Sequence, residues 1–271
     1  MKLQKLISKL EKHHKKKLDL SLGRTFNLLK KLGDPQDKLK NVITVVGTNA
    51  KASMCYSLKS ILNQGGYKTN LYTSPHLLSY TERYVFEDKE INEEDLIELL
   101  TDVEKTLGDD NATLFEILTC AFLKHAENFR DNINIIEAGL FHQFDSTNVF
   151  KENLMTLIGV IHNDHFQWLE NKSIEGVIYE KTAKLLNSNI FINKQVNNEI
   201  RDKIEKSLKK NTSNKYFFGK DFNIAKSENG FIQYQDQLGE LVLPEPSILG
   251  DHQLYNVSTS IAASRLSLIH I

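Results

Sequence analysis

The most constraining stretch of the chain is a run of β-branched residues that stops at a glycine and leads into a helical pattern. It reads Asn-Val-Ile-Thr-Val-Val-Gly-Thr-Asn-Ala-Lys-Ala-Ser over residues 41–53. The apolar run predicts a buried strand, Gly47 a turn, and the residues up to Gly65 an amphipathic helix. A strand, a short turn and a helix in this order favour a parallel α/β fold.

The turn in this stretch has the residues of a phosphate-binding loop. Backbone N–H groups of such a turn point at a phosphate, Lys51 adds a positive charge, and the Ser53 hydroxyl can bind Mg²⁺. Ala50 and Ala52 stand beside Lys51, whereas a standard loop has glycine before the lysine. If position 50 needs a left-handed backbone, alanine costs about 1–2 kcal/mol there. From these residues alone, an ordinary strand–turn–helix crossover with a solvated lysine stays an alternative.

Composition limits the classes of partner and compartment. The 271 residues include 34 Lys and Arg against 35 Asp and Glu, so charge gives no reason to expect nucleic acid as a partner. Cys55 and Cys120 lie in apolar helical patterns and are expected to be reduced core residues. No apolar run approaches the roughly 20 residues that span a bilayer, so we expect no membrane contact and a cytoplasmic protein.

Strands alternate with helices along most of the chain. Further strands are expected over 67–72, 133–137, 154–161 and 190–192, and the almost continuous apolar run of 154–161 is typical of a central parallel strand. This order predicts a doubly wound, mostly parallel sheet, in which ligands collect at the carboxyl ends of the strands. The phosphate loop, Glu137 and His165 all follow such ends, so we expect them to share one site.

Helix-capping signals mark the intervening segments. Asn92 is the expected N-cap of a helix that runs to Leu107, and Thr113 to Glu116 form a capping box before a helix that runs to Phe129. Other helical patterns cover 1–32, 173–186 and 198–209, and the last helix begins near 250. Short strands between 215 and 243 are expected to form a small antiparallel β addition to the main sheet.

Metal binding is expected at the same edge of the sheet. Glu137 and His165 are candidate ligands of a Mg²⁺ ion that bridges nucleotide phosphates. His142, His162 and His165 offer zinc as an alternative, although their spacing matches no common zinc pattern.

Seven short blocks, in order, resemble a known family. They are Leu-Asp-Leu-Ser-Leu-Gly-Arg at 18–24 with Leu-Gly-Asp-Pro at 32–35, the phosphate loop at 47–53, Ser-Pro-His-Leu at 74–77 with Tyr-Thr-Glu-Arg at 80–83, Glu-Ala-Gly-Leu at 137–140 with Asp-Ser-Thr-Asn at 145–148, Asp-His at 164–165, Glu-Lys at 180–181, and Gly-Asp-His-Gln-Leu-Tyr-Asn at 250–256. With them the chain resembles the ATP-binding part of folylpolyglutamate synthase/dihydrofolate synthase, in the Mur ligase superfamily. The resemblance implies a helical segment over 1–40 that packs on the core and a Mur-ligase-type ATP-binding domain over 41–265.

The resemblance also implies a reaction. ATP phosphorylates a carboxylate of dihydropteroate or of a folate, the amine of L-glutamate attacks the acyl phosphate, and an amide forms with release of ADP and phosphate. Such an enzyme of folate biosynthesis and one-carbon metabolism uses ATP and Mg²⁺ with small-molecule substrates, and family members are commonly monomeric.

Roles follow for residues that match the family motifs. ATP binding is implied for Thr48, Asn49, Ala50, Lys51, Ala52, Ser53, His252, Gln253 and Asn256. Metal binding is implied for Ser53, Glu137, His165 and Lys181, where Lys181 matches a lysine that family members carry as a carbamate. Catalytic roles are implied for Lys51, His165 and Lys181, and substrate binding for Ser74, Pro75, Tyr80, Arg83 and Asp145.

The sequence departs from the family in three blocks and in length. The family's Gly-Lys-Gly is Ala-Lys-Ala at 50–52, its Gly-Leu-Gly-Gly-Arg-Leu-Asp is Gly-Leu-Phe-His-Gln-Phe-Asp at 139–145, and its Glu-Lys-Ala-Gly is Glu-Lys-Thr-Ala at 180–183. The family's second domain, which contributes to glutamate binding, is missing, and the tail at 266–271 matches the translation of a sequencing adapter. We therefore expect a truncated reading of a longer gene, with weak ATP binding and little ligase turnover on its own.

Two other functions stay open at this point. One is another Mur-type ligase that acts on a cell-wall precursor. The other is a non-catalytic nucleotide-binding protein, suggested by Ala50, Ala52 and the absent domain.

Overall fold

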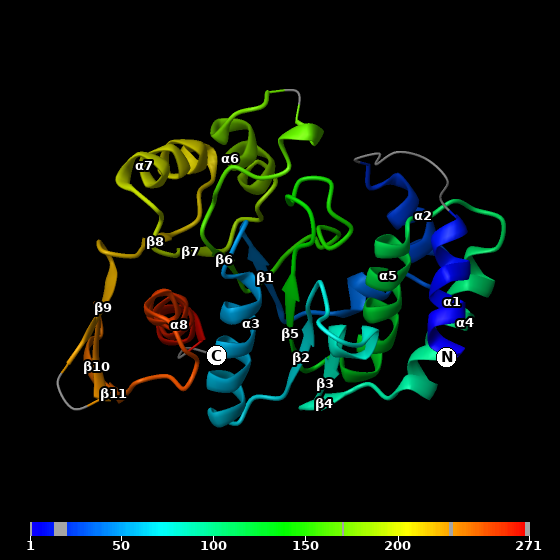
Figure 1. Cartoon of the computed structure of the whole chain (residues 1–271), viewed down its shortest axis with the longest axis horizontal. Helices are drawn as coiled ribbons and strands as arrows, with labels where there is room; N and C mark the ends of the chain where they lie inside the picture. The colour runs from blue at the N-terminus through cyan, green and yellow to red at the C-terminus, as the bar shows by residue number, and fades with distance from the viewer. Residues whose placement is uncertain (1, 14–20, 170, 228–229, 269–271) are drawn as a thin grey trace.

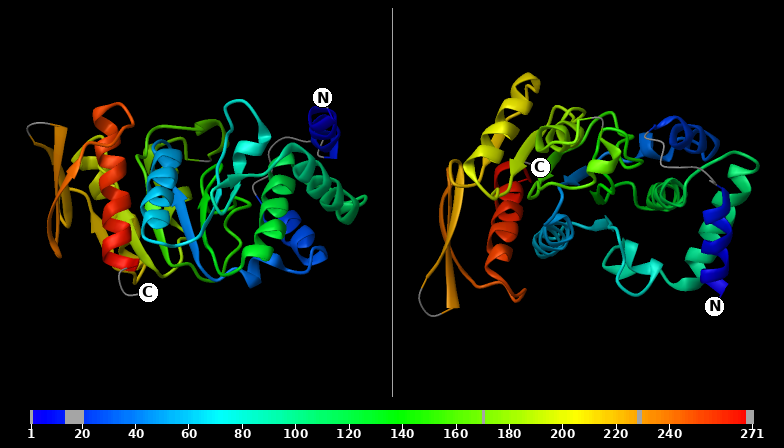
Figure 2. Two further views of the ribbon diagram at one scale, coloured as in Figure 1. Left: turned by 90° about the horizontal axis from the view of Figure 1, so that it is seen from below. Right: turned by 45° about the horizontal axis from the view of Figure 1, so that its top comes forward.

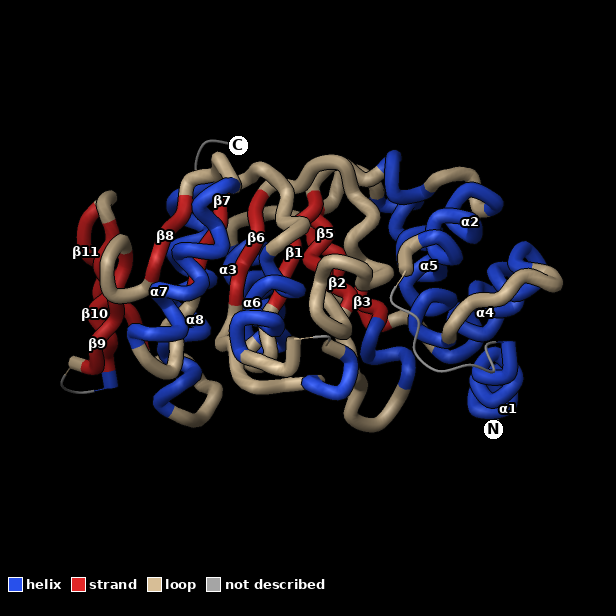
Figure 3. The backbone as a smooth tube through the Cα atoms, turned by 90° about the horizontal axis from the view of Figure 1, so that it is seen from above, coloured by secondary structure: helices blue, strands red, loops and turns tan. Residues whose placement is uncertain are grey.

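The chain folds around an eight-stranded sheet, shown in the computed structural model of Figure 1, which describes residues 2–13, 21–169, 171–227 and 230–268. Its strands are β1 (Val42–Val46), β2 (Thr69–Tyr72), β3 (Tyr84–Phe86), β4 (Lys89–Glu90), β5 (Ile133–Glu137), β6 (Met155–Ile158), β7 (Asn189–Ile192) and β8 (Lys215–Phe217). The order across the sheet is β4-β3-β2-β5-β1-β6-β7-β8, and the strands from β3 to β8 can be followed in Figure 3. Among the described strands of this sheet, only β3 runs opposite to the others, so the β2–β3 and β3–β4 pairs are antiparallel and the remaining pairs are parallel. The predicted doubly wound, mostly parallel sheet is confirmed.

Helices cover both faces of this sheet. On one face α3 (Lys51–Gln64) and α8 (Asp251–Ala263) lie side by side and pack on alternate residues of the central strands, such as Ile43 and Val45 of β1. The opposite face is covered by α5 (Leu114–Ala126) on one half and by α6 (Ile174–Thr182) on the other, with α7 (Asn198–Ser207) packed on α6. The two-residue repeat of a strand explains why neighbouring residues of β1 enter different cores.

The N-terminal residues form helices beside α5 rather than one long helix. They are α1 (Lys2–Leu10) and α2 (Gly23–Lys31), which join α4 (Glu93–Leu107) and α5 in one apolar core (Figure 2). The helical pattern ends where it is expected to end, because α2 stops at Lys31 and Gly33 follows with a φ of 85°. Residues 14–20, which include part of the first family block, lie outside the described residues.

The capping predictions are confirmed at both helices. The Asn92 side chain accepts a hydrogen bond from the N–H of Asp95 at the start of α4. Thr113 and Glu116 form the reciprocal capping box at the start of α5. Cys55 and Cys120 are both buried and free. Within the described residues, no helix is long and apolar enough to cross a membrane.

The C-terminal strands differ from the prediction in one respect. The first of them, β8, extends the main sheet parallel to β7, because its Tyr216 and Phe217 pair with Phe191 and Ile192. The other three, β9 (Phe222–Lys226), β10 (Phe231–Asp236) and β11 (Gly239–Pro244), form a separate antiparallel sheet against α8. The small antiparallel sheet is thus confirmed, but it has three strands and is not joined to the main sheet as expected.

Residues of the predicted tail continue from α8. A π-helical turn covers Ser264–Leu268, in which Leu266 is buried in the core beneath α3 and α8. Residues 269–271 lie outside the described residues.

Candidate functional site

Five strands of the main sheet end at one edge and place polar residues there. The phosphate loop follows β1, Ser74 follows β2, and Glu137 is the last residue of β5. His165 comes after the segment that leaves β6, and Asn193 directly follows β7. The carboxyl ends of parallel strands meet at this edge, and it therefore carries the candidate site.

The phosphate loop has a fixed and strained backbone. Ala50 adopts φ 73° and ψ −10°, which is the left-handed region that the sequence left in question for this position. The loop is held by the N–H groups of Thr48 and Asn49, which both donate to the carbonyl of Val160 at 2.9 and 3.0 Å. Gly159 makes this approach possible, because a Cβ there would lie 2.4 Å from the carbonyl oxygen of Asn49.

Lys51 opens α3 and lies among acceptors at this edge. Its ammonium donates to the Thr48 carbonyl at 3.3 Å and lies 3.9 Å from a carboxylate oxygen of Glu137. The free N–H groups of the first turn of α3 and this charge together favour an anion.

The first of three cavities around this loop lies between the loop and α8. It has a volume of about 430 Å³ and is lined by Asn49, Ala50, Ser53, Val160, His162, Asn193, Lys194, His252, Gln253, Tyr255 and Asn256. The structure thus brings the start of α8 to the phosphate loop, although about 200 residues of chain separate them. His252, Gln253 and Asn256, predicted to bind ATP, all face this cavity.

A second, larger cavity of about 600 Å³ lies on the other side of Lys51. Its lining combines apolar and charged groups and comprises Gly47, Thr48, Lys51, Ser74, Pro75, Arg83, Thr113, Phe115, Glu116, Gly139, Leu140, Phe144, Asp145, Ser146, Asp164, His165, Trp168 and Lys181. Most residues with a predicted role in substrate binding meet here. The third cavity, of about 380 Å³, lies between the phosphate loop, Tyr56, the segment 73–77, Glu82 and Glu137.

Glu137 is a buried carboxylate. Its Oε2 atom accepts a hydrogen bond from the N–H of Ser74 at 3.0 Å, and the residue is 3% exposed. Burial raises the pKa of Glu137 to about 7 from 4.5, although the nearby Lys51 charge opposes this shift. A cation placed next to this carboxylate would therefore gain a strong interaction.

Lys181 is a buried amine close to the phosphate loop. Its Nζ donates to the carbonyl of Gly47 at 3.0 Å and lies 5.6 Å from the centre of the Phe141 ring. Burial, helped by the Lys51 charge, lowers the pKa of Lys181 to about 7. His142 lies nearby in the sequence block that departs from the family, and its buried Nδ1 atom has no hydrogen-bond partner among the residues that the structure describes.

The predicted substrate-binding residues take different positions. Ser74, Pro75, Arg83 and Asp145 line the second cavity. Tyr80 lines none of the three cavities, and its ring instead lies against His76 and under the Arg83 guanidinium, 5.1 Å away. Tyr80 therefore supports Arg83 rather than facing the cavity.

Asp145 uses its oxygens to hold its own loop. They accept hydrogen bonds from the N–H of Leu140 at 2.8 Å, from the N–H of Thr147 at 3.0 Å and from the Thr147 hydroxyl at 2.5 Å. These bonds fix the loop that replaces the glycine-rich block of the family, and they make Asp145 part of the cavity wall.

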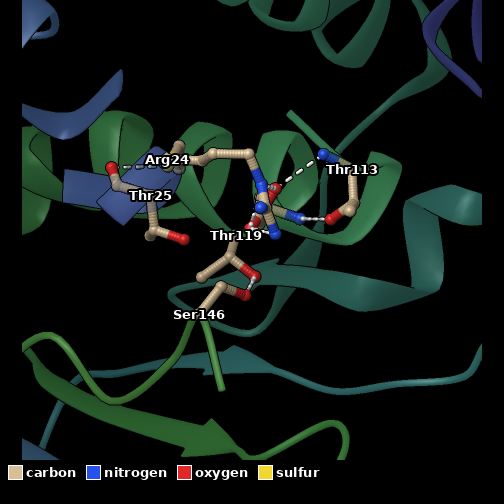
Figure 4. A network of polar contacts seen from close by, with 7 residues as sticks. Arg24, Thr25, Thr113, Thr119 and Ser146 are labelled. Carbon is tan, nitrogen blue, oxygen red and sulfur yellow. Dashed lines mark hydrogen bonds and ion pairs between the residues drawn. The ribbon is translucent and has the colours of Figure 1, made fainter. Parts of the chain in front are cut away.

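A polar network connects the N-terminal helices to the second cavity. The Arg24 guanidinium of α2 donates to both carboxylate oxygens of Glu116, at 2.9 to 3.2 Å (Figure 4). Glu116 also caps α5 through the N–H of Thr113. One turn further along α5, the Thr119 hydroxyl lies 2.9 Å from that of Ser146 (Figure 4). The wall formed by Glu116 and Ser146 is thereby fixed from α2.

The candidate metal ligands do not form one preformed cluster. Ser53 faces the first cavity, His165 and Lys181 the second, and Glu137 the third. The His165 ring lies 3.2 Å from Asp164, and no group of three His, Cys, Asp or Glu residues in the described part of the chain could hold a metal ion. Glu137 fits Mg²⁺ best, because it is a buried oxygen ligand whose charge is poorly compensated, and Mg²⁺ takes few ligands from protein when phosphates supply others.

Sequence reasoning missed several residues of the cavity walls. Asn193 and Lys194 directly follow the strand that the sequence predicts over 190–192. Because ligands bind at the carboxyl ends of parallel strands, the end of this strand could have been included among the candidate positions. Phe115, Glu116 and Trp168 gave no such signal, because helices and loops bring them to the cavity only in the folded chain.

Known proteins match the chain strongly in sequence and in structure. It is 35% identical to the dihydrofolate synthase/folylpolyglutamate synthase of Escherichia coli over 163 residues, which cover 60% of this chain and 38% of that protein. The enzyme of the same name from Bacillus subtilis is 36% identical over 169 residues, covering 60% of this chain and 39% of that protein. The chain is a homologue of dihydrofolate and folylpolyglutamate synthases. No protein-family model matches it.

The fold agrees with this homology. A structure of E. coli FolC in complex with DHPP and ADP superposes with a TM-score of 0.83 and 27% sequence identity, covering 97% of this chain and 62% of that one. The chain therefore spans less than two thirds of the length of these relatives. The resemblance seen in the motifs is confirmed.

Proposed function

We propose that the chain is the nucleotide-binding part of an ATP-dependent ligase that adds L-glutamate to dihydropteroate or a folate. The observation that supports this proposal most strongly is the position of the phosphate loop between two cavities. Asn49, Ala50 and Ser53 line the first cavity, while Thr48 and Lys51 line the second. A nucleoside in the first cavity would have its terminal phosphate at the mouth of the second, where a carboxylate acceptor would lie.

Each residue contributes a defined part of this chemistry. Loop N–H groups and Lys51 bind phosphate oxygens, and Lys51 stabilises the charge of the transferring phosphoryl group. Ser53 and Glu137 would hold Mg²⁺, which neutralises phosphate charge when bound. Arg83, supported by Tyr80, and the wall formed by Ser74, Pro75 and Asp145 would orient the acceptor.

Lys181 and His165 are proposed to serve a second metal. An ammonium cannot bind a cation, but the lowered pKa of Lys181 leaves much of its amine neutral at pH 7 to 8. A neutral amine adds to CO₂ to form a carbamate and releases one proton, which converts the side chain into an oxygen ligand. The domain limits at 40 and 265, a monomeric state and a cytoplasmic location also belong to this proposal and rest on the family resemblance.

The test is glutamate-dependent phosphate release. The 271-residue chain and the full product of its gene are assayed with ATP, Mg²⁺, L-glutamate and either dihydropteroate or tetrahydrofolate. Turnover that requires glutamate and is lost in Lys51→Ala would support the proposal, and the preferred acceptor would identify the substrate. ATP binding without turnover of either acceptor by the full product would contradict it and favour a non-catalytic nucleotide-binding protein. Turnover with a muramyl nucleotide would favour the other ligase class.

A further inference from the structure

The carboxyl end of β7 presents two residues to the first cavity, and no role has been assigned to them. Asn193 is 2% exposed, whereas the neighbouring Lys194 is exposed. The Lys194 ammonium lies 3.9 Å from the centre of the Tyr255 ring, the residue before Asn256 in α8. The end of β7 and the first turns of α8 therefore contact each other at two adjacent points.

A chain of side-chain amides runs from the backbone just after β7 to α8. The Asn193 oxygen accepts a hydrogen bond from the N–H of Lys194 at 2.7 Å. The Asn193 amide nitrogen donates to the Asn256 oxygen at 2.7 Å, and the Asn256 nitrogen donates to the Gln253 oxygen at 2.8 Å. Asn193 and Asn256 are both buried, so each link replaces a bond to water.

The direction of this chain is set by its first link. A backbone N–H can only donate, so the oxygen of Asn193 must face it and the amide nitrogen must face Asn256. The same reasoning then fixes Asn256, and through it Gln253. The oxygen of Gln253 is used by Asn256, which leaves its NH₂ group to face a ligand in the cavity.

We propose that Asn193 is a positioning residue that fixes the hydrogen-bond polarity of the first cavity, so that Gln253 offers a donor to a ring nitrogen of a purine base. This inference rests on the proposed function, in which the first cavity takes the nucleoside of ATP. It extends that function to the residue that follows β7, and it states which partner donates the hydrogen bond to the base.

Substitution of Asn193 by aspartate reverses the chain. One oxygen of Asp still accepts from the N–H of Lys194, but the other faces Asn256 and requires a donor from it. Asn256 and then Gln253 must turn, and Gln253 presents its oxygen to the cavity. Gln253→Glu produces the same acceptor directly at the half-buried end of the chain, without changing the buried residues.

The experiment measures equilibrium binding of Mg²⁺ complexes of ATP and of its 1-deaza, 3-deaza and 7-deaza analogues to the 271-residue chain. Each analogue replaces one ring nitrogen acceptor by C–H. We expect one analogue to bind about tenfold more weakly than ATP to the original chain, as the loss of one hydrogen bond predicts. In Asn193→Asp and Gln253→Glu, the ratio of the dissociation constant of that analogue to that of ATP should fall below about twofold. Because the ratio compares the dissociation constants of an analogue and of ATP for the same variant, any general weakening of triphosphate binding cancels.

Asn189→Asp, at the start of β7, is the matched control. It introduces the same charge at the opposite end of this strand from Asn193, and it should keep the tenfold ratio. An unchanged ratio in both site variants, or no penalty for any analogue in a chain that binds ATP, would overturn the inference while leaving the proposed function intact. If Asn193→Asp does not fold, Gln253→Glu decides the question. Failure to bind both Mg²⁺-ATP and Mg²⁺-tripolyphosphate would instead refute the proposed function, and the inference with it.

Discussion

The strained alanine of the phosphate loop leads to a quantitative prediction for Ala50→Gly. At φ 73° the left-handed backbone costs an alanine about 1–2 kcal/mol of conformational strain, which is absent for glycine. Two smaller effects oppose this gain. Glycine makes the unfolded chain freer by about 0.4–1 kcal/mol, and loss of the half-buried methyl group costs about 0.4 kcal/mol, half the value of a fully buried one. We therefore expect Ala50→Gly to raise the free energy of unfolding by about 0.5 kcal/mol.

Ala52→Gly is the matched control for this change. Ala52 is an exposed residue two positions away and lies within α3, where glycine is expected to cost about 1 kcal/mol. Ala50→Gly should thus be more stable than the original chain and Ala52→Gly less stable. Their free energies of unfolding should differ by about 1.5 kcal/mol, although the two variants have identical compositions.

Chemical denaturation with urea is the appropriate assay, with thermal melting as a second measure. The difference corresponds to about 3 °C or more between the two melting temperatures. Equal destabilisation by both substitutions would refute the reasoning, because it would mean that Ala50 is not strained. We also expect Ala50→Gly to retain ATP binding, since glycine adopts the same backbone conformation without strain.

Gly159, Arg24 and Asp236 each make a close contact whose loss should be measurable. Gly159→Ala should weaken ATP binding about tenfold or more, since its Cβ would displace the Asn49 carbonyl. Gly23→Ala should leave equilibrium ATP binding unchanged, because within the described residues the nearest atom to its Cβ would be the Ser21 hydroxyl oxygen at 4.0 Å. Arg24→Lys should lower the free energy of unfolding, measured in urea, by about 2 kcal/mol, because lysine cannot make the paired hydrogen bonds to Glu116. Lys105→Ala, which removes an exposed ion pair, is the control, and an equal or smaller loss of stability in Arg24→Lys would contradict this prediction. Asp236→Asn should cost about 3 kcal/mol at pH 7, because it leaves the Arg265 cation without its buried carboxylate.

The pH dependence of the Asp236 effect has a definite sign. Burial of Asp236 opposes its ionisation, but hydrogen bonds from Arg265, Leu238 and Tyr234 outweigh it and lower the pKa of the carboxyl below 3.8. The stabilisation is therefore present above pH 3.8 and is lost as the pH falls through the lowered pKa. The stability difference between the original chain and Asp236→Asn should shrink in that acidic range, and a difference that stays constant down to pH 2 would contradict this account.

The sequence by itself determined the class of fold and the edge of the sheet that carries the candidate site. The β-branched runs of β1, β5, β6 and β7 are short, apolar and separated by helical patterns. Such local patterns predict strands even when the neighbours of each strand in the sheet are unknown. The capping residues Asn92 and Thr113 could also be predicted from the sequence, because a cap acts within four residues of its own helix. The phosphate loop, Glu137 and His165 were correctly placed at one edge, since topology alone brings parallel strand ends together.

Only the tertiary structure decided which side chains face which cavity. No pattern in the sequence indicates that β8 joins the main sheet while β9 to β11 form a separate sheet, since both outcomes satisfy the same short alternating patterns. It also could not show that Tyr80 lies behind Arg83, or that Asn193 and Gln253 belong to one chain of amides. These relations depend on distances between residues far apart in the sequence, and such distances are fixed only when the layers pack.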